Sequence, residues 1–469
     1  MYPSRITRRE FMSRSAAAAA GVFLGACTGT KLSTNPRPRP TFGTDPLSLD
    51  TQWPIKRVIY VMLENRSFDN LFGRFPGANG ASSGVRWGSE VPLVDCPEWL
   101  PGDLPHDLTA WLDSYNGGAM DGFAQGDYGP YYSYSSFPEH DVSNYFHWAK
   151  NNVLCDNFYA SASGPSFNNH LFWISGQSGG AIDNPENIMV KRVPDPAGSD
   201  EPLIFKSWGC DAYGDNVFVL VKDEVGNITK HTTCFRFPTV GEQLSEKDID
   251  WASYSANPHQ AGYIWQAYSA IEPVFSDKDM WDEHIWPVDD LFRDIEASAL
   301  PSVTWITPRF QLSDHPPFST KHAMNWITDI VNKTMKSDMW EHTAIFITWD
   351  EWGGLYDHVT PPKIDSWDLG FRVPMLVISP YAKKGYIDDG LGEFTSPLKF
   401  VADNWGLDYL TERYDKVHNF EHVFDFDKKP RDPDPLPKVK ATNKFYEFPL
   451  EFPEWPDELD PEPPKIRYP

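Results

Sequence analysis

The sequence is poor in cysteine and in basic side chains. Its 469 residues include only 5 Cys, and 41 Lys and Arg stand against 66 Asp and Glu, which gives a formal net charge of −25. No basic stripe is present, so sequence-independent binding to nucleic acid phosphates is not expected. Docking on anionic lipid by charge alone is not expected either. No C-x-x-C spacing occurs, which argues against a structural zinc site.

Long apolar runs are missing as well, and the best candidate lies at the N-terminus. Residues 16–26 are apolar but too short and too rich in alanine for a stable membrane span. They follow a basic region in which Arg8 and Arg9 match a twin-arginine signal. We therefore expect residues 1–26 to be a signal peptide that directs export.

The end of this segment carries a second targeting pattern. Residues 24–27 read L-G-A-C and resemble a lipobox, in which Cys27 is lipidated and becomes the first mature residue. Ordinary cleavage near residues 18–20 is the alternative. Residues 27–53 are rich in proline and predict a stiff tether. These features predict a periplasmic or cell-surface protein attached to the membrane through an N-terminal lipid.

Apolar runs alternate with helical patterns along the rest of the chain. Strands are expected at residues 58–63, 303–307, 344–349 and 375–379, and a helix at residues 318–335. Such alternation is typical of parallel βαβ units. It predicts an α/β fold in which helices flank a mostly parallel central sheet.

Other segments lack this alternation of strands and helices, and they set the expected limits of the domains. We expect one catalytic domain over residues 54–428, with a loop-rich cap insertion at about 180–290. Residues 76–145 show little periodicity and predict long loops over a site, or a lid. Residues 429–469 are rich in proline and acids and predict an extended, surface-hugging or disordered tail.

Two of the expected strands end in carboxylates. Glu64 and Asn65 follow the first strand, and Asp350 and Glu351 follow the third. Because the carboxyl ends of parallel strands meet at one edge of a sheet, these side chains predict one composite metal or acid/base site. The alternative is two core strands with solvated ends. Ligation by oxygen favours Ca²⁺, Mg²⁺ or Mn²⁺ over Zn²⁺.

Five ordered blocks carry a family resemblance. They are E-N-R-S-F-D at 64–69, G-P-S-F-N-N at 164–169, D-H-P at 314–316, D-E-W-G-G-L-Y-D-H-V at 350–359 and R-V-P-M-L-V-I-S-P at 372–380. The chain resembles the bacterial phosphoesterase family of non-specific phospholipases C and acid phosphatases over residues 54–415. The resemblance implies a fold like that of the alkaline phosphatase superfamily and a metal-dependent site.

Ser166 is the candidate nucleophile for cleaving a phosphate ester. A turn at Gly164-Pro165 precedes a helical pattern, so Ser166 is expected at a helix N-terminus, where free N–H groups favour an anion. A plain N-cap serine is the alternative. In the resembled family this position is usually Thr, and Asn168 stands where Pro is usual. Asn169 matches the family's asparagine and is a further catalytic candidate.

Two histidines are candidates for protonating the leaving group or holding phosphoryl oxygens. His358 closely follows the acidic pair Asp350-Glu351, and His315 follows the expected strand at 303–307. Asp314 and Asp357, which precede them, could orient the rings or hold ligand. His259, in the insertion, is a weaker candidate.

Four further cysteines allow up to two disulfides in an oxidising compartment. They are Cys96, Cys155, Cys210 and Cys234. Three pairings are possible, and we favour a bridge between Cys210 and Cys234, which flank a stretch rich in strand-forming residues.

Together these patterns predict an exported, metal-dependent phosphoesterase with a serine nucleophile. Phospholipase C activity is placed ahead of acid phosphatase activity, because long aromatic loops suit a lipid head group. The expected substrate is a phospholipid or a small phosphate ester, and no protein partner is inferred. A non-catalytic surface lipoprotein is the rival from another class. A sulfatase is disfavoured, because Ser166 lacks the C/S-x-P-x-R frame.

Overall fold

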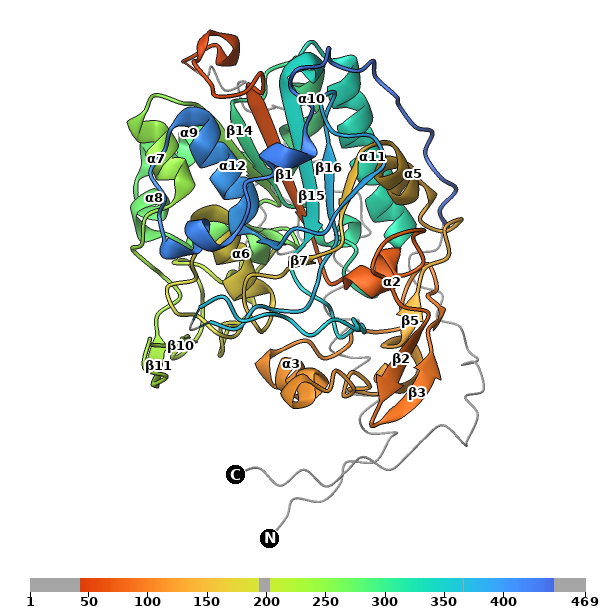
Figure 1. Ribbon diagram of the computed structural model, residues 1–469. Coiled ribbons are helices and arrows are strands. Elements are labelled where there is room, and N and C mark those ends of the chain that lie inside the picture. The colour runs from red at the N-terminus through yellow and green to blue at the C-terminus, as the bar shows by residue number, and fades with distance from the viewer. Residues whose placement is uncertain (1–42, 194–202, 366, 443–469) are drawn as a thin grey trace.

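An eight-stranded sheet forms the centre of the molecule (Figure 1). The computed structural model describes residues 43–193, 203–365 and 367–442. The strands follow in spatial order: β13 (Ile285–Pro287), β12 (Trp251–Ser255), β14 (Val303–Ile306), β1 (Arg57–Leu63), β15 (Thr343–Trp349), β16 (Met375–Ile378), β6 (Val153–Cys155) and β17 (Tyr386–Asp388). All neighbouring pairs are parallel except those of β16 with β15 and with β6. The predicted α/β class with a mostly parallel sheet is confirmed.

One of the four expected strands is antiparallel to its neighbours in the mostly parallel sheet. The four expected strands correspond to β1, β14, β15 and β16, but β16 is antiparallel to β15. A parallel return needs a long crossover, usually a helix. The described residues between β15 and β16, 350–365 and 367–374, contain no helix. The chain therefore folds back and pairs in the opposite direction.

Helices cover both faces of the sheet (Figure 1). On β15, Phe346 packs against Phe400 of α12 (Thr395–Trp405), whereas Trp349 packs against Tyr145 of α5 (Ser143–Asn151). Side chains an odd number of positions apart on a strand point to opposite faces. Both faces are therefore covered, which is why every residue of β1 and β15 is buried. The expected helix at 318–335 is α11 (Thr320–Lys336) on the α5 side.

The segment expected as a cap insertion divides into two parts. Its first part contains the β10–β11 hairpin (Val219–Lys222 and Ile228–His231) and α7 (Val240–Glu246). Its second part supplies β12 and β13 to one edge of the central sheet. The expected insertion therefore includes two strands of the central sheet, with α8 (Glu272–Ser276) and α9 (Lys278–His284) between them. The favoured disulfide between Cys210 and Cys234 is confirmed, and Cys96 and Cys155 are buried free thiols.

The described parts of both terminal segments pack on the domain. Trp53 is buried and stacks on Phe400 with ring centroids 4.6 Å apart, so the expected tether is anchored before β1. Residues 430–442 run along α11, where Asn332 and Asn325 exchange hydrogen bonds with the backbone of Leu436 and Val439. The expected signal peptide, Cys27 and residues 443–469 lie outside the described residues. Within the described chain, no helix is long and apolar enough to cross a membrane.

Candidate active site

Two carboxylates meet at the edge of the sheet where β1 and β15 end. Leu63 pairs with Trp349 in register, so Glu64 and Asp350, the next residues, emerge side by side. Asp350 N–H continues the pairing by donating to Leu63 O at 3.0 Å. Both side chains are fully buried. The predicted convergence of the two strand ends is therefore present in the structure.

Asn65 has a backbone conformation that links the end of β1 to the end of β15. Its φ of 60° lies in the left-handed region, which asparagine tolerates better than most residues. Its backbone N–H donates to Asp350 Oδ1 at 2.9 Å. Gly353 packs directly on it, since a Cβ at Gly353 would lie 2.6 Å from Asn65 Cβ. The Gly353-Gly354 turn after β15 thus allows the two strand ends to approach each other.

Several oxygen atoms at this edge have no hydrogen-bond partner among the described residues. They are Glu64 Oε2, Asn65 Oδ1, Asp350 Oδ2 and Glu351 Oε1. Buried polar atoms are normally paired, and a cation is one way to satisfy them. The donor set of three carboxylates and an amide is one that a divalent cation accepts. The residues present therefore fit a metal ion.

Ser166 approaches the same carboxylates from the start of α6 (Ser166–Ser175). It is buried, and its hydroxyl lies near enough to the Glu64 carboxylate to lower the pKa of that group. One turn later, His170 Nε2 lies 2.9 Å from Glu64 Oε1 and 3.9 Å from Asp350 Oδ2. Residues four apart share one face of a helix, so Ser166 and His170 reach the acidic edge together. Glu64, His170 and Asp350 have ligand atoms close enough to hold one ion.

Burial dominates the electrostatics of this acidic edge. Burial raises the pKa of Glu64 well above its usual value, and the nearby Asp350 raises it further. Burial also raises the pKa of Glu351. It lowers the pKa of His170 to about 4, so this ring is neutral at pH 7. A positive ion between crowded, buried carboxylates would favour their ionised form.

A second group contains two histidines and lies within electrostatic reach of the first. Asp103 Oδ1 is 3.6 Å from His106 Nδ1, and Asp103 Oδ2 is 3.9 Å from His315 Nε2. The two rings are 5.6 Å apart in an edge-to-face arrangement. His106 borders a cavity of about 320 Å³ whose wall includes Asn184. Asn184 Oδ1 accepts the N–H of Phe167, so this cavity lies beside the first turn of α6.

At neutral pH His106 is positively charged, whereas His315 is neutral. Burial opposes protonation of His106, but Asp103 and Glu351 outweigh it and raise its pKa to about 9. Burial lowers the pKa of His315, whose Nδ1 donates to Pro316 O at 2.6 Å. Neutral His315 therefore presents an unprotonated Nε2 beside a cationic His106. Paired groups with pKa values shifted apart are typical of acid and base roles.

His358 lies in a different network from His315. Its Nδ1 is 2.6 Å from Asp69 Oδ2, and its Nε2 is 3.2 Å from Asn79 Oδ1. Arg372, fully buried, joins this network through Asp357 at 2.8 Å and Asp69 at 3.4 Å. The contacts recorded for His358 therefore attach the loop after β15 to α2 (Phe68–Phe72) and do not include Glu64, Ser166 or Asp350.

Two other candidates support the loops around the site. Asn169 Oδ1 accepts from Ala162 N at 3.0 Å, and its Nδ2 donates to Pro165 O at 3.1 Å. It thereby shapes the loop that delivers Ser166. Asp314 accepts from Trp349 Nε1 at 3.0 Å and pairs with Arg66, so it fixes the backbone before His315 and does not touch that ring. His259 is exposed on the insertion.

Two candidate site residues were missed by the reasoning from sequence. His170 could have been found, because a helix that starts at Ser166 places the residue four positions later on the same face. His106 gave no such signal, because it lies in the segment 76–145 that shows no periodicity.

Comparison with known proteins places the chain in a family. Residues 55–408 match the model of the Phosphoesterase family, so the chain belongs to this family. It is a hydrolase that acts on phosphoric ester bonds.

Phospholipase C B of Mycobacterium tuberculosis (strain ATCC 25618 / H37Rv) is 25% identical over an alignment of 477 positions, which includes 86% of this chain and 82% of that protein. Non-hemolytic phospholipase C of Pseudomonas aeruginosa is 24% identical over an alignment of 428 positions, which includes 75% of this chain and 54% of that protein. A solved structure from Vibrio parahaemolyticus, described as a protein in the alkaline phosphatase superfamily, shares 11% identity. Its TM-score is 0.34, over 89% of this chain and 79% of that one.

Proposed function

We propose that the protein is a metal-dependent phosphoesterase of the phospholipase C type, with Ser166 as its nucleophile. The observation that carries the proposal is the meeting of a helix-start serine with buried carboxylates that each have one oxygen without a hydrogen-bond partner among the described residues. Glu64, Asn65, Asp350 and Glu351 would hold a divalent ion of the Ca²⁺, Mg²⁺ or Mn²⁺ type. When bound, that ion supplies charge neutralisation for phosphoryl oxygens and lowers the pKa of the attacking hydroxyl.

Four side chains have separate roles in the reaction. Ser166 Oγ gives its proton to solvent and attacks phosphorus, and the bond from phosphorus to the leaving oxygen breaks as a serine phosphoester forms. His106, cationic at neutral pH, gives its proton to the leaving oxygen. His315, with a free Nε2, takes a proton from the water that attacks the serine phosphoester, and it passes this proton to Ser166 Oγ as the bond from Oγ to phosphorus breaks. His106 regains its proton from solvent. His170 donates to Glu64 and keeps that carboxylate oriented.

A phosphodiester substrate fits this site better than a phosphomonoester. A terminal monoester carries two charges and usually calls for extra cations. Three arginines lie near the strand ends, and each is paired with a carboxylate: Arg66 with Asp314, Arg309 with Asp289, and Arg372 with Asp357. The acidic net charge of −25 adds a bias against polyanionic substrates. The relatives named phospholipase C point in the same direction.

Export by the twin-arginine route and lipid attachment at Cys27 are part of the proposal. The Cys210–Cys234 disulfide suits an oxidising compartment, since disulfides persist mainly outside the cytoplasm. Changing Arg8 and Arg9 to lysine is expected to leave precursor in the cytoplasm. Cys27→Ser is expected to release protein from membranes without stopping export. Unchanged membrane attachment of the Cys27→Ser protein would show that no lipid anchor exists.

Substrate class is tested by comparing two esters with the same leaving group. The diester is p-nitrophenylphosphorylcholine and the monoester is p-nitrophenyl phosphate. We expect kcat/KM to be higher for the diester, and release of diacylglycerol from phosphatidylcholine. A monoester preference of about tenfold, or 1.4 kcal/mol in transition-state binding, would assign the site to a phosphatase.

A further inference from the structure

The residue after the nucleophile is held by two aromatic side chains from the insertion. The Phe167 ring lies 6.2 Å from the Trp208 ring and 6.3 Å from the Phe235 ring, measured between centroids. All three side chains are buried. The α6 helix starts at Pro165-Ser166 without a side-chain N-cap bond. The position of its first turn therefore depends on contacts from other segments.

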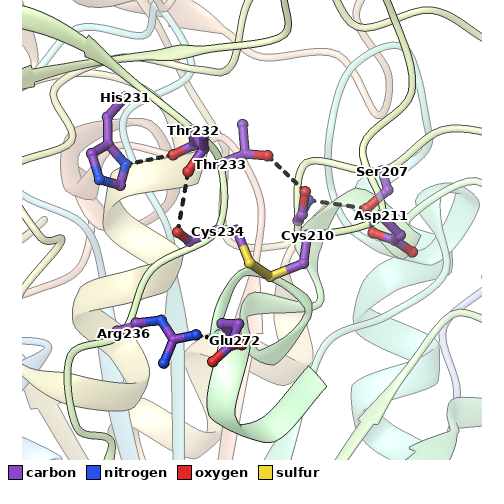
Figure 2. Close-up of a disulfide and its surroundings, with 10 residues drawn as sticks. Ser207, Cys210, Asp211, His231, Thr232, Thr233, Cys234, Arg236 and Glu272 are labelled. Carbon is purple, nitrogen blue, oxygen red and sulfur yellow. Dashed lines mark hydrogen bonds and ion pairs between the residues drawn. A yellow bond between two sulfur atoms is a disulfide. The ribbon is translucent and has the colours of Figure 1, made fainter. Parts of the chain in front are cut away.

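The disulfide ties together the two segments that carry these rings. Figure 2 shows the bridge between Cys210, two residues after Trp208, and Cys234, directly before Phe235. Beside the bridge, Thr233 Oγ1 donates to Gly209 O at 2.6 Å. The sulfur–sulfur bond closes a separation of 24 residues that contains the β10–β11 hairpin.

Both bridged segments are also attached to η4 (Ala267–Ala270), which packs against α6. Cys210 N donates to Ser269 O at 2.8 Å, and Phe235 N donates to Ala270 O at 2.7 Å. The bridge, η4 and the two rings form one support beneath the start of α6. Loss of the bridge would remove the covalent link between the two ring-bearing segments and leave the hydrogen bonds of Thr233 to Gly209 and of both segments to η4.

We propose that the Cys210–Cys234 disulfide positions Ser166 for attack, by holding Trp208 and Phe235 against Phe167. This inference rests on the proposed role of Ser166 as nucleophile. The bridge does not touch the reacting atoms, so the two cysteines are positioning residues. A displacement of about 1 Å at a reacting group can cost about 100-fold in rate, so even a small loosening of this support is expected to show in kcat.

The bridge can be opened selectively. Cys210 and Cys234 are half-buried, whereas the described free thiols, Cys96 and Cys155, are buried. Dithiothreitol opens the bridge by thiol–disulfide exchange: the bridge becomes two thiols, and the reagent becomes its cyclic disulfide. Removal of the reductant and air oxidation should restore the bridge.

The first experiment separates positioning from overall stability. The Cys210→Ala/Cys234→Ala protein and dithiothreitol-treated wild type are assayed with p-nitrophenylphosphorylcholine, at a temperature where melting curves show both folded. We expect kcat to fall by about tenfold or more with KM changed less than about threefold, and reoxidised wild type to recover. A bridge-free enzyme with wild-type kcat and only a lower Tm would overturn the proposal.

The second experiment asks whether the effect passes through Phe167. In a Phe167→Leu background, removing the bridge should change kcat by less than about twofold while still lowering Tm. Phe275→Leu is the control, because the Phe275–Trp281 pair belongs to the same insertion and is not in contact with Phe167 in the described aromatic pairs. In that background the full effect of the bridge should remain. Additive losses in the Phe167→Leu protein would overturn the proposed route.

A third measurement does not depend on catalysis. Hydrogen exchange followed by mass spectrometry reports opening of the peptide that contains residues 164–172. We expect reduction to speed exchange in this peptide by about tenfold or more, with little change in β1 and β15. Unchanged exchange there would overturn the positioning role. Faster exchange in an enzyme that cleaves no phosphate ester would instead contradict the proposed function.

Discussion

The close contact between Gly353 and Asn65 allows a sharp test of the site geometry. In a Gly353→Ala protein the new Cβ would lie 2.6 Å from both Asn65 Cβ and Asn65 O. These atoms must move to at least 3.4 Å, an ordinary contact distance, which is a shift of about 0.8 Å. Asn65 N–H holds Asp350 Oδ1 at 2.9 Å, so this shift moves a ligand of the proposed metal ion.

The shift predicts a large loss of activity. A displacement near 1 Å can cost about 100-fold in rate, which corresponds to about 2.7 kcal/mol in the barrier. The left-handed φ of Gly353, +62°, adds about 1 kcal/mol of backbone strain to the folded state. Steady-state kinetics, bound-metal content and Tm are measured together. We expect kcat/KM to fall about 100-fold and metal content to drop.

Gly117→Ala is the matched control. Gly117 has the same φ of +62°, and a Cβ there meets nothing within 4 Å. It therefore carries the backbone cost without the contact, and we expect activity within about twofold of wild type. If the Gly353→Ala protein is as active as the Gly117→Ala protein, then the contact with Asn65 does not set the site geometry.

Three further predictions follow from the charges. Asp350→Asn should lose bound divalent metal and activity together, as measured by elemental analysis and turnover; an active, metal-free enzyme would contradict the proposed site. Activity should decline as pH rises through about 9, where His106 loses its proton, and His106→Gln should remove this limb from the pH profile. At His358, burial disfavours the charge, but the bond to Asp69 outweighs it and raises the pKa. Its contribution to folding is therefore largest below the unfolded value of about 6.5 and is lost as pH rises through the folded pKa. His358→Gln should lower Tm mainly at acidic pH, and an equal loss at pH 9 would refute this.

The convergence of the two acidic strand ends was predictable, because the sequence pattern of each strand reflects its buried position in the sheet. Parallel strands buried on both faces read as continuous apolar runs, so the residues that break the runs, Glu64 and Asp350, mark one sheet edge. The direction of β16 was not predictable from its composition, since a buried antiparallel strand has the same apolar run as a parallel one. It depends on the length and structure of the connection after β15.

The sequence did not predict which histidines lie near the acidic strand ends. His358 is close to Asp350 in the sequence, but in the structure its ring contacts the buried side chains of Asp69 and Arg372. His106 reaches the site because its loop packs against the turn after β15: a Cβ at Gly354 would lie 2.6 Å from Leu104 Cβ. Contacts between segments so far apart in sequence leave no local periodicity to detect.

The role of Ser166 is tested most directly by replacing its hydroxyl. Ser166→Ala removes one oxygen at a helix start whose neighbours, Phe167 and Asn169, retain their contacts, so the fold and Tm should be preserved. With p-nitrophenylphosphorylcholine as substrate, kcat is expected to fall by about three orders of magnitude or more. A folded Ser166→Ala protein that turns over this diester at near wild-type rates would contradict the account.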